Sequence, residues 1–187
     1  DAASFNINYD GCDAAQSFTI TGPTPIIAGE LFIEPDCWAD SNGIITLSPS
    51  GGTPGTPAYT YLWDNTASLP NGSTAPSETA LGAGTYAITI TDGNNCDITI
   101  LVDLTQPEQL QNDFTVTDVL CSGDNTGKII RNTTGGTPTA TPPYYNYNWG
   151  GINPTAVAAG TYPVIITDAN GCSITDTAIV GEPNPLA

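Results

Sequence analysis

The chain has 187 residues, of which 39% are hydrophobic, and nineteen acidic residues against two basic ones give it a net charge of −17. Such a surface repels phosphate backbones and anionic lipids, so we expect neither nucleic-acid binding nor membrane insertion. Histidine is absent and no pair of carboxylates recurs in a pocket-like context, so a Ser-His-Asp triad is excluded and no enzymatic activity is expected.

Glycine, proline and threonine are abundant and no stretch keeps a helical period, so the composition predicts an all-β protein of short strands joined by turns. The five cysteines, without histidine, argue against a zinc site and fit disulfides formed in an oxidising, extracellular compartment. No apolar run approaches the roughly 20 residues of a membrane helix.

The first segment, residues 1–26, is expected to be the closing hairpin of an incomplete repeat. Residues 5–9 alternate between apolar and polar side chains and lead through a short turn to Cys12. Two strands cannot form a sandwich alone, so the rest of this repeat either is missing from the chain or is supplied by another subunit.

Two longer copies follow, residues 27–110 and residues 111–187, and the same landmarks recur in both. In order, these are a cysteine, an Asp-x-x-Gly turn, Gly-Gly-Thr-Pro, Tyr-x-Tyr-x-Trp and Ala-Gly-Thr-Tyr, before a second cysteine. Chance does not align so many landmarks, so each copy is predicted to be one structural unit. The five landmarks begin at Cys37, Asp40, Gly51, Tyr59 and Ala83 in the first copy, and at Cys121, Asp124, Gly135, Tyr145 and Ala159 in the second.

Alternating side chains predict that each copy is an immunoglobulin-like β-sandwich, so that the chain is a tandem array of such repeats. Tyr86 and Tyr162 follow a Gly-Thr lead-in like that of a tyrosine corner, in which the phenol bonds back to nearby backbone. Trp63 and Trp149 end a row of aromatic residues that is predicted to face the core, the alternative being a sugar-stacking platform. The strands expected in the first copy span residues 31–33, 44–48, 59–63, 86–91 and 96–104.

These motifs, in this order, closely resemble the SprB-type repeat, which occurs in very large surface adhesins of gliding and predatory Bacteroidota exported by type IX secretion. The resemblance covers both full copies and the partial one. It implies an extracellular, cell-surface filament or adhesin built from tandem immunoglobulin-like modules, which acts as a structural segment in attachment during gliding or to prey and other surfaces.

The segments that differ most between the copies are residues 64–83 and residues 150–159, which connect otherwise constant strands. Loops of this kind carry recognition in many sandwiches, so the alternative function is a glycan- or calcium-dependent surface-binding module. Sugars are also expected as modifications. Asn71 and Asn132 lie in N-glycosylation sequons, and Thr177 lies in a motif that resembles the O-glycosylation signal of Bacteroidota.

Four aspartates lie in Gly/Asn-rich turns and are weak candidates for metal ligands: Asp40, Asp92, Asp124 and Asp168. Calcium requires six to eight oxygen ligands, usually from several carboxylates, and each turn offers only one. Capping of the turn by the aspartate explains the residue without a metal. No cofactor is therefore expected, with calcium kept as the alternative.

Gln106-Pro107 and Glu182-Pro183 are short, stiff connections, which favour an extended rod over a flexible string. We expect this rod to assemble with copies of itself into a filament. Because copies charged this heavily repel one another, side-by-side packing is predicted to need screening by salt or divalent cations and to weaken as ionic strength falls.

Each full copy has one cysteine before its second strand and one at the start of its last strand. The preferred pairing is within copies, Cys37 with Cys96 and Cys121 with Cys172, which leaves Cys12 without a partner. The alternative joins Cys37 to Cys172, because the two turns lie at opposite ends of an ordinary sandwich while those of successive modules meet in a head-to-tail array.

Overall fold

Residues 2–9, 12–19, 21–64 and 73–184 are described by a computed structural model of the chain. Within these ranges the protein forms thirteen strands and no helix, which confirms the all-β prediction. The first two strands, β1 (Ala2–Tyr9) and β2 (Cys12–Thr19), form an antiparallel hairpin. The same ranges contain no helix that is long and apolar enough to cross a membrane.

The next strands form a sandwich of two antiparallel three-stranded sheets, ordered β3-β4-β6 and β5-β7-β8. The connection between β5 and β7 is long enough to add its own strand, β6, to the sheet opposite. The strands are β3 (Glu30–Ile33), β4 (Gly43–Leu47), β5 (Thr60–Asp64), β6 (Ser77–Leu81), β7 (Gly84–Thr91) and β8 (Asp97–Leu104).

The core of this first sandwich follows from the two-residue period of its strands. On β7, Tyr86, Ile88 and Ile90 are fully buried, and the residues between them are not. They meet Ile45 of β4, which is equally buried in the facing sheet. Burial of the alternate residues on both sheets is what holds the two layers together.

The second sandwich repeats this plan with one strand fewer. Its sheets are ordered β9-β10 and β11-β12-β13, and the described residues between β11 and β12 form no strand to match β6. The shorter connection in this copy accounts for the difference. The strands are β9 (Gln111–Thr117), β10 (Lys128–Thr134), β11 (Asn146–Asn148), β12 (Gly160–Thr167) and β13 (Ser173–Val180).

Each sandwich has its own hydrophobic core, and the cores place the boundaries a few residues earlier than the sequence predicted. Leu110, expected at the end of the first repeat, is buried in the second core. Ile26, expected in the preceding hairpin, packs against the first core. The reason is that the backbone before each first strand already lies against the sandwich, where the Thr24 and Glu108 carbonyls accept hydrogen bonds from Gly52 and Gly136.

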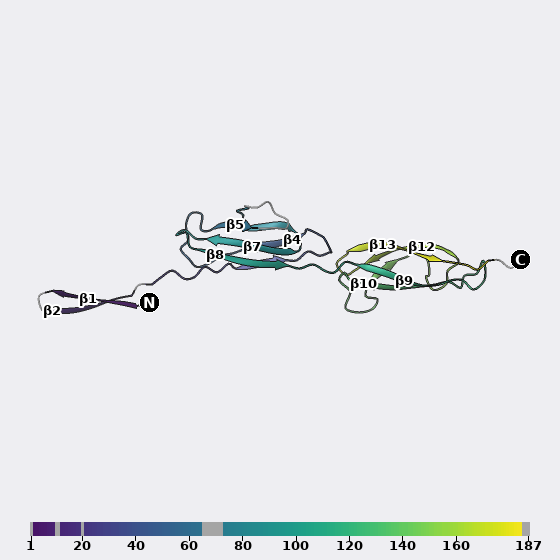
Figure 1. Ribbon diagram of the computed structural model, residues 1–187, viewed down its shortest axis with the longest axis horizontal. Helices are drawn as coiled ribbons and strands as arrows, with labels where there is room; N and C mark the ends of the chain where they lie inside the picture. Colours follow the sequence, from purple (N-terminus) through teal and green to yellow (C-terminus); the bar gives the residue numbers. More distant parts are fainter. Residues whose placement is uncertain (1, 10–11, 20, 65–72, 185–187) are drawn as a thin grey trace.

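Both repeats contain the tyrosine corner. The Tyr86 hydroxyl donates to the Gly82 carbonyl at 2.7 Å, and the Tyr162 hydroxyl donates to the Ala158 carbonyl at 2.8 Å. Along the rod the two sandwiches lie end to end (Figure 1). The end of the first sandwich that holds the turn after β3 therefore meets the end of the second that holds the turn between β12 and β13.

Candidate functional site

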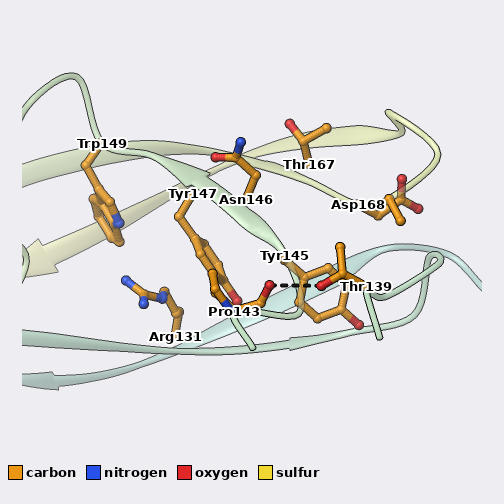
Figure 2. Close-up of a pocket in the computed structure, with 10 residues that line it drawn as sticks. Arg131, Thr139, Pro143, Tyr145, Asn146, Tyr147, Trp149, Thr167 and Asp168 are labelled. Carbon is orange, nitrogen blue, oxygen red and sulfur yellow. Dashed lines mark hydrogen bonds between the residues drawn. The ribbon is translucent and has the colours of Figure 1, made fainter. Parts of the chain in front are cut away.

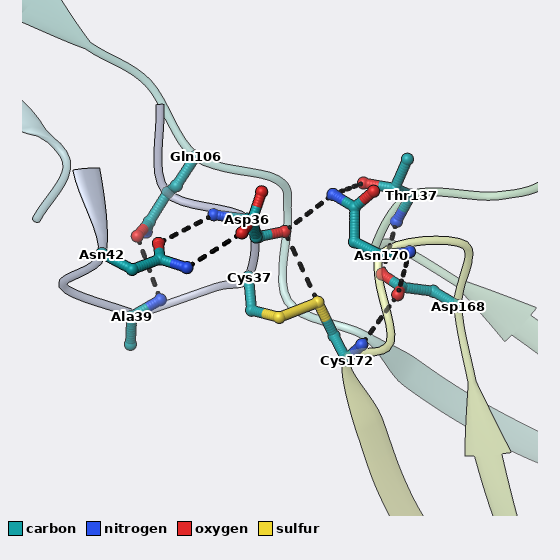
Figure 3. The surroundings of a disulfide bond; sticks show 9 residues. All are labelled: Asp36, Cys37, Ala39, Asn42, Gln106, Thr137, Asp168, Asn170 and Cys172. Carbon is teal, nitrogen blue, oxygen red and sulfur yellow. Dashed lines mark hydrogen bonds between the residues drawn. A yellow bond between two sulfur atoms is a disulfide. The ribbon is translucent and has the colours of Figure 1, made fainter. Parts of the chain in front are cut away.

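The two sandwiches are joined by a disulfide bond between Cys37 and Cys172 (Figure 3). Their Cα atoms are 5.7 Å apart, within the ordinary range for a disulfide. The preferred pairing of Cys37 with Cys96 and of Cys121 with Cys172 is wrong, and the alternative pairing of Cys37 with Cys172 is the one that the structure contains.

The geometry of one sandwich explains why the pairing within repeats fails. Leu81 pairs with Gly43 at the end of β4 nearest Cys37, and β7 starts three residues after Leu81. Cys96 follows the opposite end of β7. Eight residues of strand at about 3.3 Å each separate those ends by roughly 25 Å, far beyond the limit of about 7 Å between bridged Cα atoms.

The bond is surrounded by polar contacts between the repeats. Asn170, two residues before Cys172, donates from its side-chain amide to the Asp36 carbonyl at 3.0 Å and to Thr137 Oγ1 at 3.2 Å. Asn42 in turn holds Asp36 through two hydrogen bonds. The Asn42 side-chain oxygen accepts from the Asp36 backbone N–H at 3.1 Å, and the Asn42 side-chain amide donates to the Asp36 carboxylate at 2.9 Å. Asn170 and the disulfide thus fix the same turn of the first repeat.

The turn that carries Cys37 is also tied to the connection between the repeats. The Ala39 N–H donates to Gln106 Oε1 at 3.0 Å. The second repeat has the same arrangement, because the Gly123 N–H donates to Glu182 Oε2 at 3.1 Å. The turns after β3 and β9 therefore have the same support, whether or not their cysteine is bonded.

The turn that carries Cys172 is organised by Asp168, whose side chain is buried. Its carboxylate accepts backbone N–H groups from Thr137 at 2.8 Å and from Asn170 and Cys172 at 2.9 Å each. Asp168 thereby positions both residues that reach across to the first repeat. The sequence contained this signal as an aspartate two residues before an asparagine and four before a cysteine in both copies.

Asp92 has the same role in the first repeat. The backbone N–H groups of Thr53, Cys96 and Asn94 hold the pKa of the Asp92 carboxyl below its usual value, against the opposing effect of burial. The carboxylate is thus engaged in capping its own turn. Asp40 and Asp124 are exposed in the other turns, and no group of three or more His, Cys, Asp or Glu suited to a metal occurs in the described residues.

Packing at the junction is incomplete. Two hollows of about 480 and 270 Å³ lie between the repeats, the first lined by Pro35 and Pro138, the second by Trp38 and Ile174, among others. The contact is therefore not a continuous apolar interface, and the disulfide supplies a constraint that packing does not.

Two further cysteines are free and exposed, Cys96 and Cys121. They occupy the positions in the repeat that correspond to Cys172 and Cys37. The side chain of Cys12 lies outside the described residues. Of the glycosylation candidates, Asn132 and Thr177 are exposed on strands, and Asn71 lies outside the described residues.

Comparison with known proteins supports the resemblance seen in the sequence. The family model described as SprB repeat matches residues 34–68, which run from just before Cys37 through β4 and β5 of the first sandwich. No curated protein matches the chain. The matched segment includes the turn that carries Cys37, one of the two cysteines of the junction, and Cys172 lies outside it.

Proposed function

We propose that this chain is a structural segment of a long extracellular surface filament or adhesin, in which successive sandwich repeats are covalently stapled end to end. The observation that carries the proposal is the Cys37–Cys172 bond between the repeats. The SprB repeat match supports the assignment to a surface adhesin that acts in attachment.

The bond changes how tension passes through the rod. Force applied along the chain enters at Cys37 and leaves at Cys172, so the intervening backbone bears almost none of it. The two cysteines are 135 positions apart, which includes β4 to β12. A staple in this position suits a filament that anchors a cell under load, because the strands from β4 to β12 cannot be pulled out into extended chain.

The free cysteines indicate that the staple recurs. Cys121 lies in a turn supported by Glu182, as Cys37 lies in a turn supported by Gln106. Cys96 lies in a turn capped by Asp92, as Cys172 lies in one capped by Asp168. Each is thus one half of a junction, ready to bond to the complementary turn of another repeat.

Non-reducing peptide mapping of filament material taken from the cell surface tests the proposed function. We expect peptides that contain Cys96 and Cys121 to be disulfide-bonded to turn peptides of other repeats, alongside the Cys37–Cys172 pair. Free thiols at both positions in that material would contradict a stapled array. Electron micrographs of the same material that show only isolated globular particles would contradict the filament.

Homomeric side-by-side assembly is part of the proposal, and an apolar edge strand supports it. The strand β3 is an edge of its sheet, and its apolar residues Leu31, Phe32 and Ile33 are 70%, 45% and 55% exposed. Apolar side chains on an open sheet edge favour contact with another molecule. The net charge of −17 opposes that contact unless salt screens it.

Sedimentation at low and high salt tests this assembly. We expect association to increase with ionic strength, and the double variant Leu31→Ser, Ile33→Ser to remove it. The matched control is Leu101→Ser on β8, a leucine that is 70% exposed as well. An assembly state that does not change with salt, or an equal effect of the Leu101 variant, would refute the role given to β3.

A further inference from the structure

The second sandwich is open on one side, between β10 and β11. A groove of about 650 Å³ lies there, and Arg131, Tyr145, Tyr147 and Trp149 are among the residues that line it (Figure 2). The Arg131 guanidinium lies 4.1 Å from the centre of the Tyr147 ring. A groove of this volume is within the range of ligand-binding sites.

In the first sandwich, an extended segment that leads into β6 closes the same side. The Trp63 indole N–H donates to the Ala75 carbonyl at 2.8 Å, and the Trp63 backbone N–H donates to the Ser73 carbonyl at 3.1 Å. On the facing sheet, the Leu47 N–H donates to the Pro76 carbonyl at 2.9 Å. One stretch of backbone therefore satisfies donors on both sheets.

The corresponding segment of the second sandwich stops short of this position. Val157 forms a β-bridge with Gly127, and the Pro154 carbonyl accepts from the Ile129 N–H at 2.8 Å. Trp149, which corresponds to Trp63, is 7% exposed, and its indole nitrogen is buried without a hydrogen-bond partner in the described structure. A buried donor left unpaired is destabilising, so an acceptor supplied from outside would be bound favourably.

The edge of β10 is open at the same place. Gly127 and Ile129 direct their N–H groups away from β9. Because alternate residues of an antiparallel strand face the same way, the backbone N–H of Arg131 also points away from β9. Arg131 occupies the position of Leu47, a core residue of the first repeat. It thus adds a positive charge to a groove that already has an unpaired edge and an unpaired indole.

We propose that this groove binds an extended, acidic peptide segment of a neighbouring copy of the chain, by strand addition to β10. A carbonyl of the incoming segment accepts from the Trp149 indole, and a carboxylate side chain pairs with Arg131. Charge favours this occupant: Lys128 and Arg131, both on β10, are the two basic residues of a chain with nineteen acidic ones. The proposal rests on homomeric assembly but not on the staple between repeats.

The test uses the oxidised 187-residue chain and a peptide with the sequence of residues 73–77 that carries Pro76→Glu, because Pro76 lies opposite Leu47 in the first sandwich and Leu47 corresponds to Arg131. In nitrogen–proton NMR spectra, each of the three tryptophans gives one indole signal. We expect the Trp149 signal, assigned with Trp149→Phe, to shift saturably with added peptide while those of Trp38 and Trp63 stay in place.

Two changes should each weaken binding about tenfold, the effect of losing one charge-assisted hydrogen bond. They are Pro76→Gln in place of Pro76→Glu in the peptide, and Arg131→Leu in the protein, which introduces the residue that the first repeat has at this position. The control Lys128→Gln removes the other, exposed positive charge and should alter binding by less than about twofold. The proposal fails if no shift occurs at millimolar peptide, if the Trp63 signal shifts instead, or if Lys128→Gln weakens binding as much as Arg131→Leu. None of these outcomes affects the disulfide mapping, which tests the bonds between repeats independently.

Discussion

Pulled from its two ends, the oxidised chain is expected to extend only through the residues outside the Cys37–Cys172 bond. The backbone between these cysteines is bypassed, since their sequence separation of 135 residues is closed by a single covalent link. At about 3.3–3.6 Å per residue, the bypassed backbone corresponds to roughly 450 Å of contour length. Single-molecule force spectroscopy should therefore find that this length is absent under oxidising conditions and appears after reduction.

The matched control is the Cys37→Ser variant, which removes the link and leaves both sandwich cores unchanged. Without reductant it should show the long extension that the oxidised parent shows only after reduction. Cys121→Ser alters the corresponding residue of the second repeat, which is free, and should behave as the parent does. If the oxidised parent released the full length of both sandwiches, the load-bearing role of the bond would be refuted.

Replacement of Trp63 by alanine is expected to destabilise the first sandwich by about 3–5 kcal/mol, the usual cost of removing a large buried aromatic side chain. Trp63 is 1% exposed and packs among residues of both sheets, and its indole holds the Ala75 carbonyl. Hydrogen exchange of the β7 and β8 amides should accelerate by roughly two to four orders of magnitude, because each 1.4 kcal/mol is a tenfold change in an equilibrium constant.

Leu62 provides the control, because it is the preceding residue on β5 and is 53% exposed on the other face. Leu62→Ala should change stability by less than about 0.5 kcal/mol. Exchange in β12 and β13 should be unaffected by either variant, since those strands belong to a separate core. Equal acceleration in both sandwiches would show that the two repeats unfold as one unit, contrary to this expectation.

The sequence by itself determined the repeat and the fold of each copy. Alternation at Tyr86, Ile88 and Ile90 is a local property that any half-buried strand must have, so it could be read without knowing the partner strand. The Gly-Thr-Tyr corners were equally legible, because a phenol that bonds four residues back needs only local chain. Comparison of the two copies added the extent of each repeat and its landmarks, which one copy alone would not have provided.

Only the tertiary structure decided how the two repeats are joined. The cysteine count allows pairing within repeats as readily as between them, and the choice depends on which ends of two sandwiches meet, a property of the whole rod. The open groove in the second sandwich could not be predicted from the sequence either. A shorter connection is visible in the sequence, but the unpaired Trp149 indole follows from where that connection stops on the facing sheet.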